Sequence, residues 1–240
     1  MKTIRFLLLL VPLAATVSGC ALVPETNRDA SIDHSKPSTC VIADVSGSTR
    51  NARGNYVGSF SDTVRKDGLE GSGDLCMIIA AGDPTQRPVM TANVGPIHRG
   101  NSTYAPREVE GKVKTITDQF RQVLVDPGVL VKGSALMESA SVASNYLESG
   151  DVLVFYSDAF QMSPLIDVHD MDYSDAGIDA ALNKLDARRL LPKMPGVTVR
   201  FPFPLVRPEQ TDLTAGQMAG IKAMWERWAV RTGTKLEWGS

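Results

Sequence analysis

Short, uninterrupted apolar runs that alternate with longer amphipathic segments constrain the fold of this chain most strongly. Residues 40–45, 74–81 and 151–156 have the length and composition of strands that are buried on both faces of a sheet. Helical patterns separate them, most clearly at 106–125, where apolar side chains recur every three or four residues. Strands and helices that alternate in this way predict an α/β fold with a three-layer, doubly wound, mostly parallel, Rossmann-like sheet.

The same patterns place the other expected elements. Helices are predicted at 56–66, 134–148, 178–191 and 215–231, and further strands at 88–94 and 197–206. The strand at 88–94 follows an Asp-Pro turn, so it is expected to return as a hairpin. In the closing helix, Trp225 and Trp228 are expected to pack against the sheet.

The N-terminal segment reads as an export signal that ends in a lipid attachment site. Lys2 and Arg5 precede an apolar stretch, 6–17, that is too short to span a bilayer. Residues 17–20, VSGC, resemble the lipobox of bacterial lipoproteins, which implies that Cys20 becomes a diacylated membrane anchor. An ordinary secretory signal with a chance cysteine is the alternative interpretation.

The sequence divides into a signal peptide at 1–19, a lipidated tether at 20–38 and one domain at 39–240. Ala21 follows the anchor in place of the Asp that commonly retains lipoproteins at the inner membrane, so the resemblance favours the outer membrane, facing the periplasm. With a net charge of -2, the chain lacks the excess of basic residues that is expected of a nucleic-acid binder. Cys40 and Cys76 would lie in an oxidising compartment, where a disulfide and two buried thiols both remain open.

A cluster of oxygen ligands follows the first apolar run. Asp44, Ser46 and Ser48 form the pattern Asp-x-Ser-x-Ser at the end of the predicted strand 40–45. Ligands that offer only oxygen favour a hard divalent cation, above all Mg2+. The alternative is a plain strand-to-helix turn, because Asp, Ser and Gly favour turns and caps for local hydrogen-bonding reasons.

Two further segments strengthen the metal interpretation and resemble the von Willebrand factor type A family. Its metal-ion-dependent adhesion site combines Asp-x-Ser-x-Ser with a hydroxyl before a helix and an aspartate after a strand. Ser134 and Asp158 occupy the second and third places in this sequence. The chain departs from the family pattern at Ser134, where threonine is usual, and at Ala159, where glycine is usual.

The resemblance implies a site for Mg2+ or Mn2+ formed by Asp44, Ser46, Ser48, Ser134 and Asp158. In the family the two serines coordinate directly, the aspartates often act through water, and an open position accepts a carboxylate from a partner protein. The expected function is therefore a membrane-anchored, metal-dependent protein-binding module for adhesion or complex assembly, with no catalytic residues.

Other interpretations of these residues stay open at this point. The Asp44 loop would also suit a periplasmic phosphohydrolase or nucleotide-binding protein, although no P-loop accompanies it. A structural lipoprotein with vestigial loops is a third possibility. An acidic cluster after the third loop is expected to be a solvated loop rather than a second cation site, and the scattered histidines are expected at the surface. The acidic cluster and the histidines comprise His34, His98, Asp167, His169, Asp170, Asp172 and Asp175.

Overall fold

The computed structural model describes residues 36–80, 89–96, 103–125, 133–203 and 212–239. Within these residues the chain forms a six-stranded sheet in the order β3-β2-β1-β4-β5-β6. Neighbouring strands are parallel, except that β2 and β3 form the predicted antiparallel hairpin. The predicted α/β fold is thereby confirmed. The strands are β1 (Thr39–Asp44), β2 (Asp74–Ala80), β3 (Met90–Asn93), β4 (Val152–Tyr156), β5 (Thr198–Phe201) and β6 (Lys235–Trp238).

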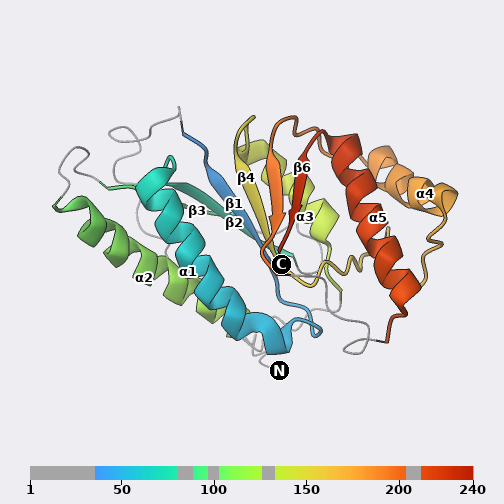
Figure 1. Ribbon diagram of the computed structural model, residues 1–240, viewed down its shortest axis with the longest axis horizontal. Coiled ribbons are helices and arrows are strands. Elements are labelled where there is room, and N and C mark those ends of the chain that lie inside the picture. The colour runs from blue at the N-terminus through green and yellow to red at the C-terminus, as the bar shows by residue number, and fades with distance from the viewer. Residues whose placement is uncertain (1–35, 81–88, 97–102, 126–132, 204–211, 240) are drawn as a thin grey trace, which may run out of the picture.

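Helices cover both faces of the sheet (Figure 1). Strand β1 lies at the centre, with β2 on one side and β4 on the other, so the strand order reverses there. In sheets of this type, ligands bind beyond the carboxyl ends of the strands at such a reversal. One face carries α1 (Arg53–Glu70) and α2 (Ala105–Val125), and the other carries α3 (Leu136–Ala143), α4 (Asp175–Ala187) and α5 (Ala215–Thr232).

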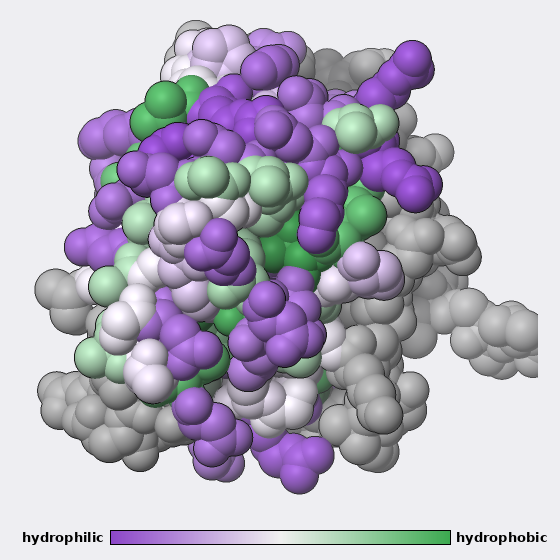
Figure 2. All heavy atoms as spheres, turned by 90° about the vertical axis from the view of Figure 1, so that its right-hand side faces the viewer, coloured by the Kyte–Doolittle hydropathy of each residue, from purple (hydrophilic) through white to green (hydrophobic). Residues whose placement is uncertain are grey.

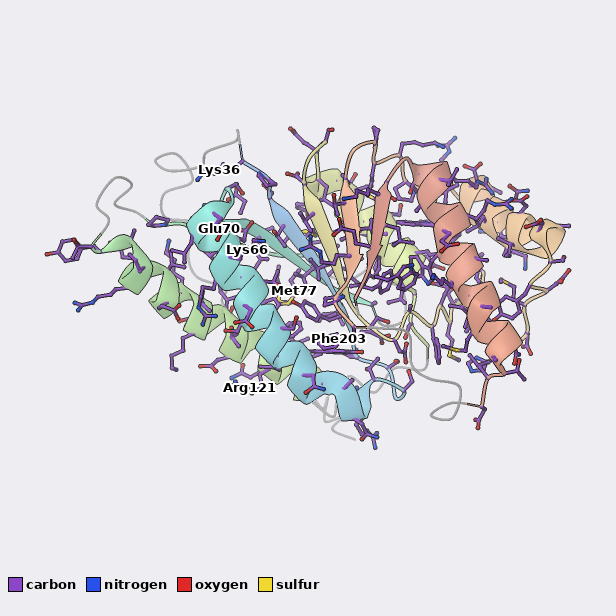
Figure 3. All side chains as sticks on the ribbon, in the orientation of Figure 1. Lys36, Lys66, Glu70, Met77, Arg121 and Phe203 are labelled. Carbon is purple, nitrogen blue, oxygen red and sulfur yellow. A yellow bond between two sulfur atoms is a disulfide. The ribbon has the colours of Figure 1, made fainter. Side chains whose placement is uncertain are left out.

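The two faces of β1 supply two separate hydrophobic cores. Val41 and Ala43 pack with α1 and α2, whereas Cys40 and Ile42 face the side of α3, α4 and α5. This split follows from the two-residue period of a strand. Met77 of β2, labelled in Figure 3, belongs to the first of these cores. Burial of all six residues of β1 makes this strand the rigid centre of the domain.

Helix α5 is anchored by its tryptophans and by well-formed ends. Trp225 and Trp228 are fully buried, as expected, and Trp225 packs edge-on against Phe155 of β4. Thr214 and Gln217 form a capping box at the start of the helix, and Gly233 ends it in the left-handed conformation. The outer face of α4 and α5 is mainly hydrophilic (Figure 2).

Several element boundaries differ from the sequence expectation. A 3-10 turn at Arg50–Ala52 leads directly into α1, which extends beyond the predicted helix 56–66 at both ends. Helix α3 is shorter than the predicted 134–148, and Ser144–Tyr146 continues it as a 3-10 turn. Strand β6 was missed because it is short and alternates charged with apolar residues at the edge of the sheet.

Cys40 and Cys76 are paired. They occupy aligned positions on β1 and β2, with 4.4 Å between their Cα atoms, and a disulfide joins them. This result decides between the two alternatives that the sequence left open. The bond links the two central strands on the α3 side of the sheet.

The signal peptide, Cys20, the tether up to residue 35, His34 and His98 lie outside the described residues. In the part of the chain that the structure describes, no helix is long and apolar enough to cross a membrane.

A polar cluster fixes the start of β1, at the end of the sheet opposite the predicted metal site. The backbone N–H of Ser38 donates to Asp151 Oδ1 at 2.7 Å, and Thr39 Oγ1 donates to Asp67 Oδ1 at 2.9 Å. Asp67 Oδ2 is buried with no hydrogen-bond partner among the described residues. Burial raises the pKa of Asp67 to about 7, against the lowering effect of the Thr39 hydrogen bond. Figure 3 labels Lys36, Lys66 and Glu70 at this end of the domain.

Replacing Asp67 with asparagine should change the pH dependence of stability. A carboxyl whose folded pKa is raised from 3.8 to about 7 costs stability progressively as pH rises through that window. At pH 8, Asp67→Asn should therefore unfold with a free energy higher than wild type by on the order of 2 kcal/mol, and at pH 4 this advantage should largely disappear. Urea unfolding at both pH values measures the difference. A constant difference between wild type and variant across pH 4–8 would contradict the assignment.

Candidate metal centre

Three loops meet at one buried carboxylate at the carboxyl end of β1. Asp44 is the last residue of β1 and is fully buried. Its Oδ1 accepts a hydrogen bond from the backbone N–H of Ser46 at 2.8 Å and another from Ser134 Oγ at 2.9 Å. Its Oδ2 accepts from Ser157 Oγ at 2.7 Å. The first, second and third loops of the predicted site are therefore all bonded to Asp44.

The remaining predicted ligands lie in the same place. Ser46 Oγ and Ser48 Oγ are 3.0 Å apart. Burial raises the pKa of Asp158 and the Ser48 hydroxyl opposes that rise, so the first and third loops lie next to each other. Ser46 is buried, whereas Ser48 is exposed, so the site opens to solvent on the side of Ser48. The structure brings all five predicted side chains together at the carboxyl end of β1.

Asp158 places a second buried carboxylate in the site. It is 4% exposed, and its Oδ1 accepts from the backbone N–H of Phe160 at 3.1 Å. Its Oδ2 is buried and has no hydrogen-bond partner among the described residues. A buried carboxylate oxygen without a donor is costly unless a proton or a cation compensates it. This oxygen and the hydroxyl groups around it fit a divalent cation.

The electrostatics of the site favour the same interpretation. Burial raises the pKa of Asp44 to about 6, and the negative charge of Asp158 adds to the effect, while hydrogen bonds from Ser157 and Ser46 oppose it. Burial also raises the pKa of Asp158. Two carboxylates that disfavour each other's charge in a buried position would both be stabilised by a bound cation.

Arg53 and Thr49 hold the first loop in place, and the sequence did not single out either residue. The Arg53 guanidinium donates to the carbonyls of Val45 and Ser46 at 2.6 and 2.9 Å, and to the carbonyl of Leu124 at 2.5 Å. Thr49 Oγ1 lies 3.0 Å from the carbonyls of both Asp44 and Ser46. Arg53 thus links the first loop to the end of α2, a contact that no local sequence pattern indicates.

The third loop contains a strained backbone conformation at the position where the family pattern usually has glycine. Ala159 has a φ of 66°, in the left-handed region where glycine is normally preferred. For alanine this conformation costs roughly 1–2 kcal/mol. The Ala159 carbonyl accepts a hydrogen bond from Trp225 Nε1 at 2.9 Å, and its N–H donates to Ser157 Oγ at 3.1 Å. These bonds hold the strained turn that follows Asp158.

Among the described residues, no group of three or more His, Cys, Asp or Glu side chains could hold a metal ion. The candidate centre differs from such a group because it contains two carboxylates and three hydroxyls. In the acidic cluster, Asp167 accepts from the backbone N–H of His169, and Asp172 accepts from that of Ser174. These carboxylates stabilise turns, as expected for a solvated loop, and His169 is exposed.

Comparisons with known protein families and with curated proteins find no match. The likeness to the type A family therefore depends on the three loops and on the order of strands and helices that presents them.

Replacing Asp158 with asparagine should raise the stability of the metal-free domain and abolish its stabilisation by Mg2+. The substitution removes one of two buried like charges, so in chelator at pH 7.5 the variant should be more stable than wild type by on the order of 1 kcal/mol. Added Mg2+ should raise the melting temperature of wild type and leave the variant unchanged. Asp186→Asn, which removes only a surface ion pair with Arg231, is the control and should behave like wild type. Equal Mg2+ responses in wild type and Asp158→Asn would contradict the assignment.

Proposed function

We propose that this chain is a lipid-anchored protein-binding module of the bacterial cell envelope, in which a divalent cation, Mg2+ or Mn2+, mediates adhesion or complex assembly. The observation that carries the proposal is the buried Asp158 Oδ2, which has no hydrogen-bond partner among the described residues and lies in the same cluster as the Ser48 hydroxyl. Resemblance to the type A family supports the same function. The metal would offer one coordination position to a carboxylate of the partner.

The contacts of each residue suggest how it would hold the ion. Ser46 and Ser48 present adjacent hydroxyls and would coordinate directly. Both oxygens of Asp44 already accept hydrogen bonds, so Asp44 would orient the other ligands and act through water. Asp158 would supply the main negative charge. The exposed side near Ser48 is where a partner carboxylate would approach.

The surroundings of Asp44 favour binding over phosphoryl chemistry. A nucleophilic aspartate needs an exposed oxygen, but Asp44 is fully buried and accepts three hydrogen bonds. A general acid two residues later would also be needed for a haloacid-dehalogenase-type mechanism, and Ser46 stands there. These contacts support a binding role for the loop.

The candidate site lies at the end of β1 opposite the residue at which the predicted tether enters the domain. The tether that follows Cys20 joins the domain at Thr39, the first residue of β1, while Asp44 ends the strand. Six strand residues separate these ends by about 17 Å. A domain held by the predicted tether would stay within a few nanometres of the outer membrane and present the candidate site away from the point where the tether enters it.

Calorimetric titration of the mature domain with Mg2+ tests the metal. Wild type should bind one ion, and the double substitution Asp44→Ala with Asp158→Ala should abolish the binding heat. Asp67→Asn is the matched control, because it neutralises another buried carboxyl with a raised pKa at the opposite end of the sheet and should bind Mg2+ like wild type. Identical titrations for wild type and the double variant would contradict the proposal. They would favour the alternative of a structural lipoprotein whose loops bind no metal.

Recovery of partners tests the binding role. The domain should capture proteins from detergent-solubilised envelopes in Mg2+ and lose them in chelator. Ser48→Ala should weaken this capture, because it removes the exposed hydroxyl ligand without disturbing the buried contacts of Asp44. Capture that is equal in Mg2+ and chelator would contradict a metal-mediated interface.

A further inference from the structure

The second and third loops of the candidate centre are joined to each other as well as to Asp44. Ser134 and Met162 form an isolated antiparallel bridge in which each backbone N–H donates to the other residue's carbonyl at 2.9 Å. Met162 also bridges to Asp167, which folds the third loop back on itself. The position of Ser134 therefore depends on the chain that follows Asp158.

Gln161 makes the side-chain part of this connection. It is fully buried, and its Oε1 accepts from the backbone N–H of Met137 at 2.9 Å. Its Nε2 donates to Glu138 Oε2 at 2.8 Å. Both partners lie in the first turn of α3, directly after the loop that carries Ser134. One amide thus bonds the third loop to the helix that follows the second loop.

This arrangement replaces an ordinary helix cap. The first N–H groups of a helix lack partners within the helix and are usually bonded by the side chain of the N-cap residue. The N-cap of α3 is Ala135, which has no side chain able to do this. Gln161 therefore supplies, from another loop, the hydrogen bond that the local sequence lacks. The start of α3 and the metal loops are constrained together as a result.

We propose that Gln161 is a positioning residue that fixes the separation of Ser134 and Asp158 and thereby makes the centre prefer Mg2+ over the larger Ca2+. The proposal rests on the metal-binding function proposed above. Mg2+ requires near-octahedral ligands at about 2.0–2.1 Å, whereas Ca2+ accepts longer and more variable distances. A second loop that is rigidly held against the third keeps the site small. Loss of the Gln161 contacts should harm Mg2+ binding more than Ca2+ binding.

Gln161→Met tests the proposal, because methionine has a similar length but lacks the amide. Calorimetry with Mg2+ and with Ca2+ should show Mg2+ affinity reduced by about tenfold or more and Ca2+ affinity reduced less, so that the ratio of the two affinities falls. Gln217→Met is the matched control, since it removes the capping glutamine of α5 and should leave the ratio unchanged. Thermal melting in chelator records the stability of each variant.

Exchanging the glutamine and the glutamate between positions 161 and 138 tests whether the contact can be restored. Gln161→Glu alone places a second carboxylate against Glu138 and should weaken Mg2+ binding. Adding Glu138→Gln exchanges acceptor and donor, so the contact with α3 can form again and the preference for Mg2+ should return. A purely structural role would restore melting temperature without restoring the affinity ratio.

The outcomes separate the two proposals. Absence of Mg2+ binding by wild type overturns both the metal function and the role of Gln161. If wild type binds Mg2+ while folded Gln161→Met keeps the wild-type ratio, only the role of Gln161 is overturned. If Gln161→Met does not fold, failure of the exchanged pair to restore the ratio overturns it.

Discussion

The buried carboxylate of Asp44 organises the carboxyl edge of this sheet. It ends the central strand β1 and accepts hydrogen bonds from Ser46, Ser134 and Ser157, one residue from each of three loops. Because β1 is buried along its whole length and lies between two cores, the position of Asp44 is set by the packing of the entire domain. The loops need no regular structure of their own, since each is held to the same rigid point.

This edge of the sheet stores unfavourable free energy. Asp44 and Asp158 place two acids in a buried position, Asp158 Oδ2 lacks a partner among the described residues, and Ala159 adopts a left-handed conformation. Strain of this kind persists where the surrounding structure over-determines it, and it concentrates at functional sites. The two hydrophobic cores and the capped helix α5 offset its cost elsewhere in the domain. A bound cation would remove most of the electrostatic part.

The sequence predicted the features that depend on local patterns. Continuous apolar runs located β1, β2 and β4. Polar residues after β1 and β4, together with a hydroxyl before α3, indicated the three loops that the structure brings together. Contacts between distant segments had no such signal. Arg53 bonds to Leu124 and Gln161 bonds to Met137, and only the folded chain brings each pair together. No sequence pattern indicates that Gln161 caps α3, because that helix begins 25 residues earlier, at Leu136.

Anomalous scattering from a crystal of the mature domain grown with Mn2+ would test the central claim most directly. Anomalous differences measured at the Mn absorption edge identify the ion, so its position does not depend on interpreting weak electron density. The account predicts a peak bounded by the hydroxyls of Ser46 and Ser48 and by Asp158, with ligand oxygens at about 2.0–2.2 Å. A crystal with well-ordered loops and no peak at this position, at a Mn2+ concentration that gives peaks elsewhere on the domain, would contradict it.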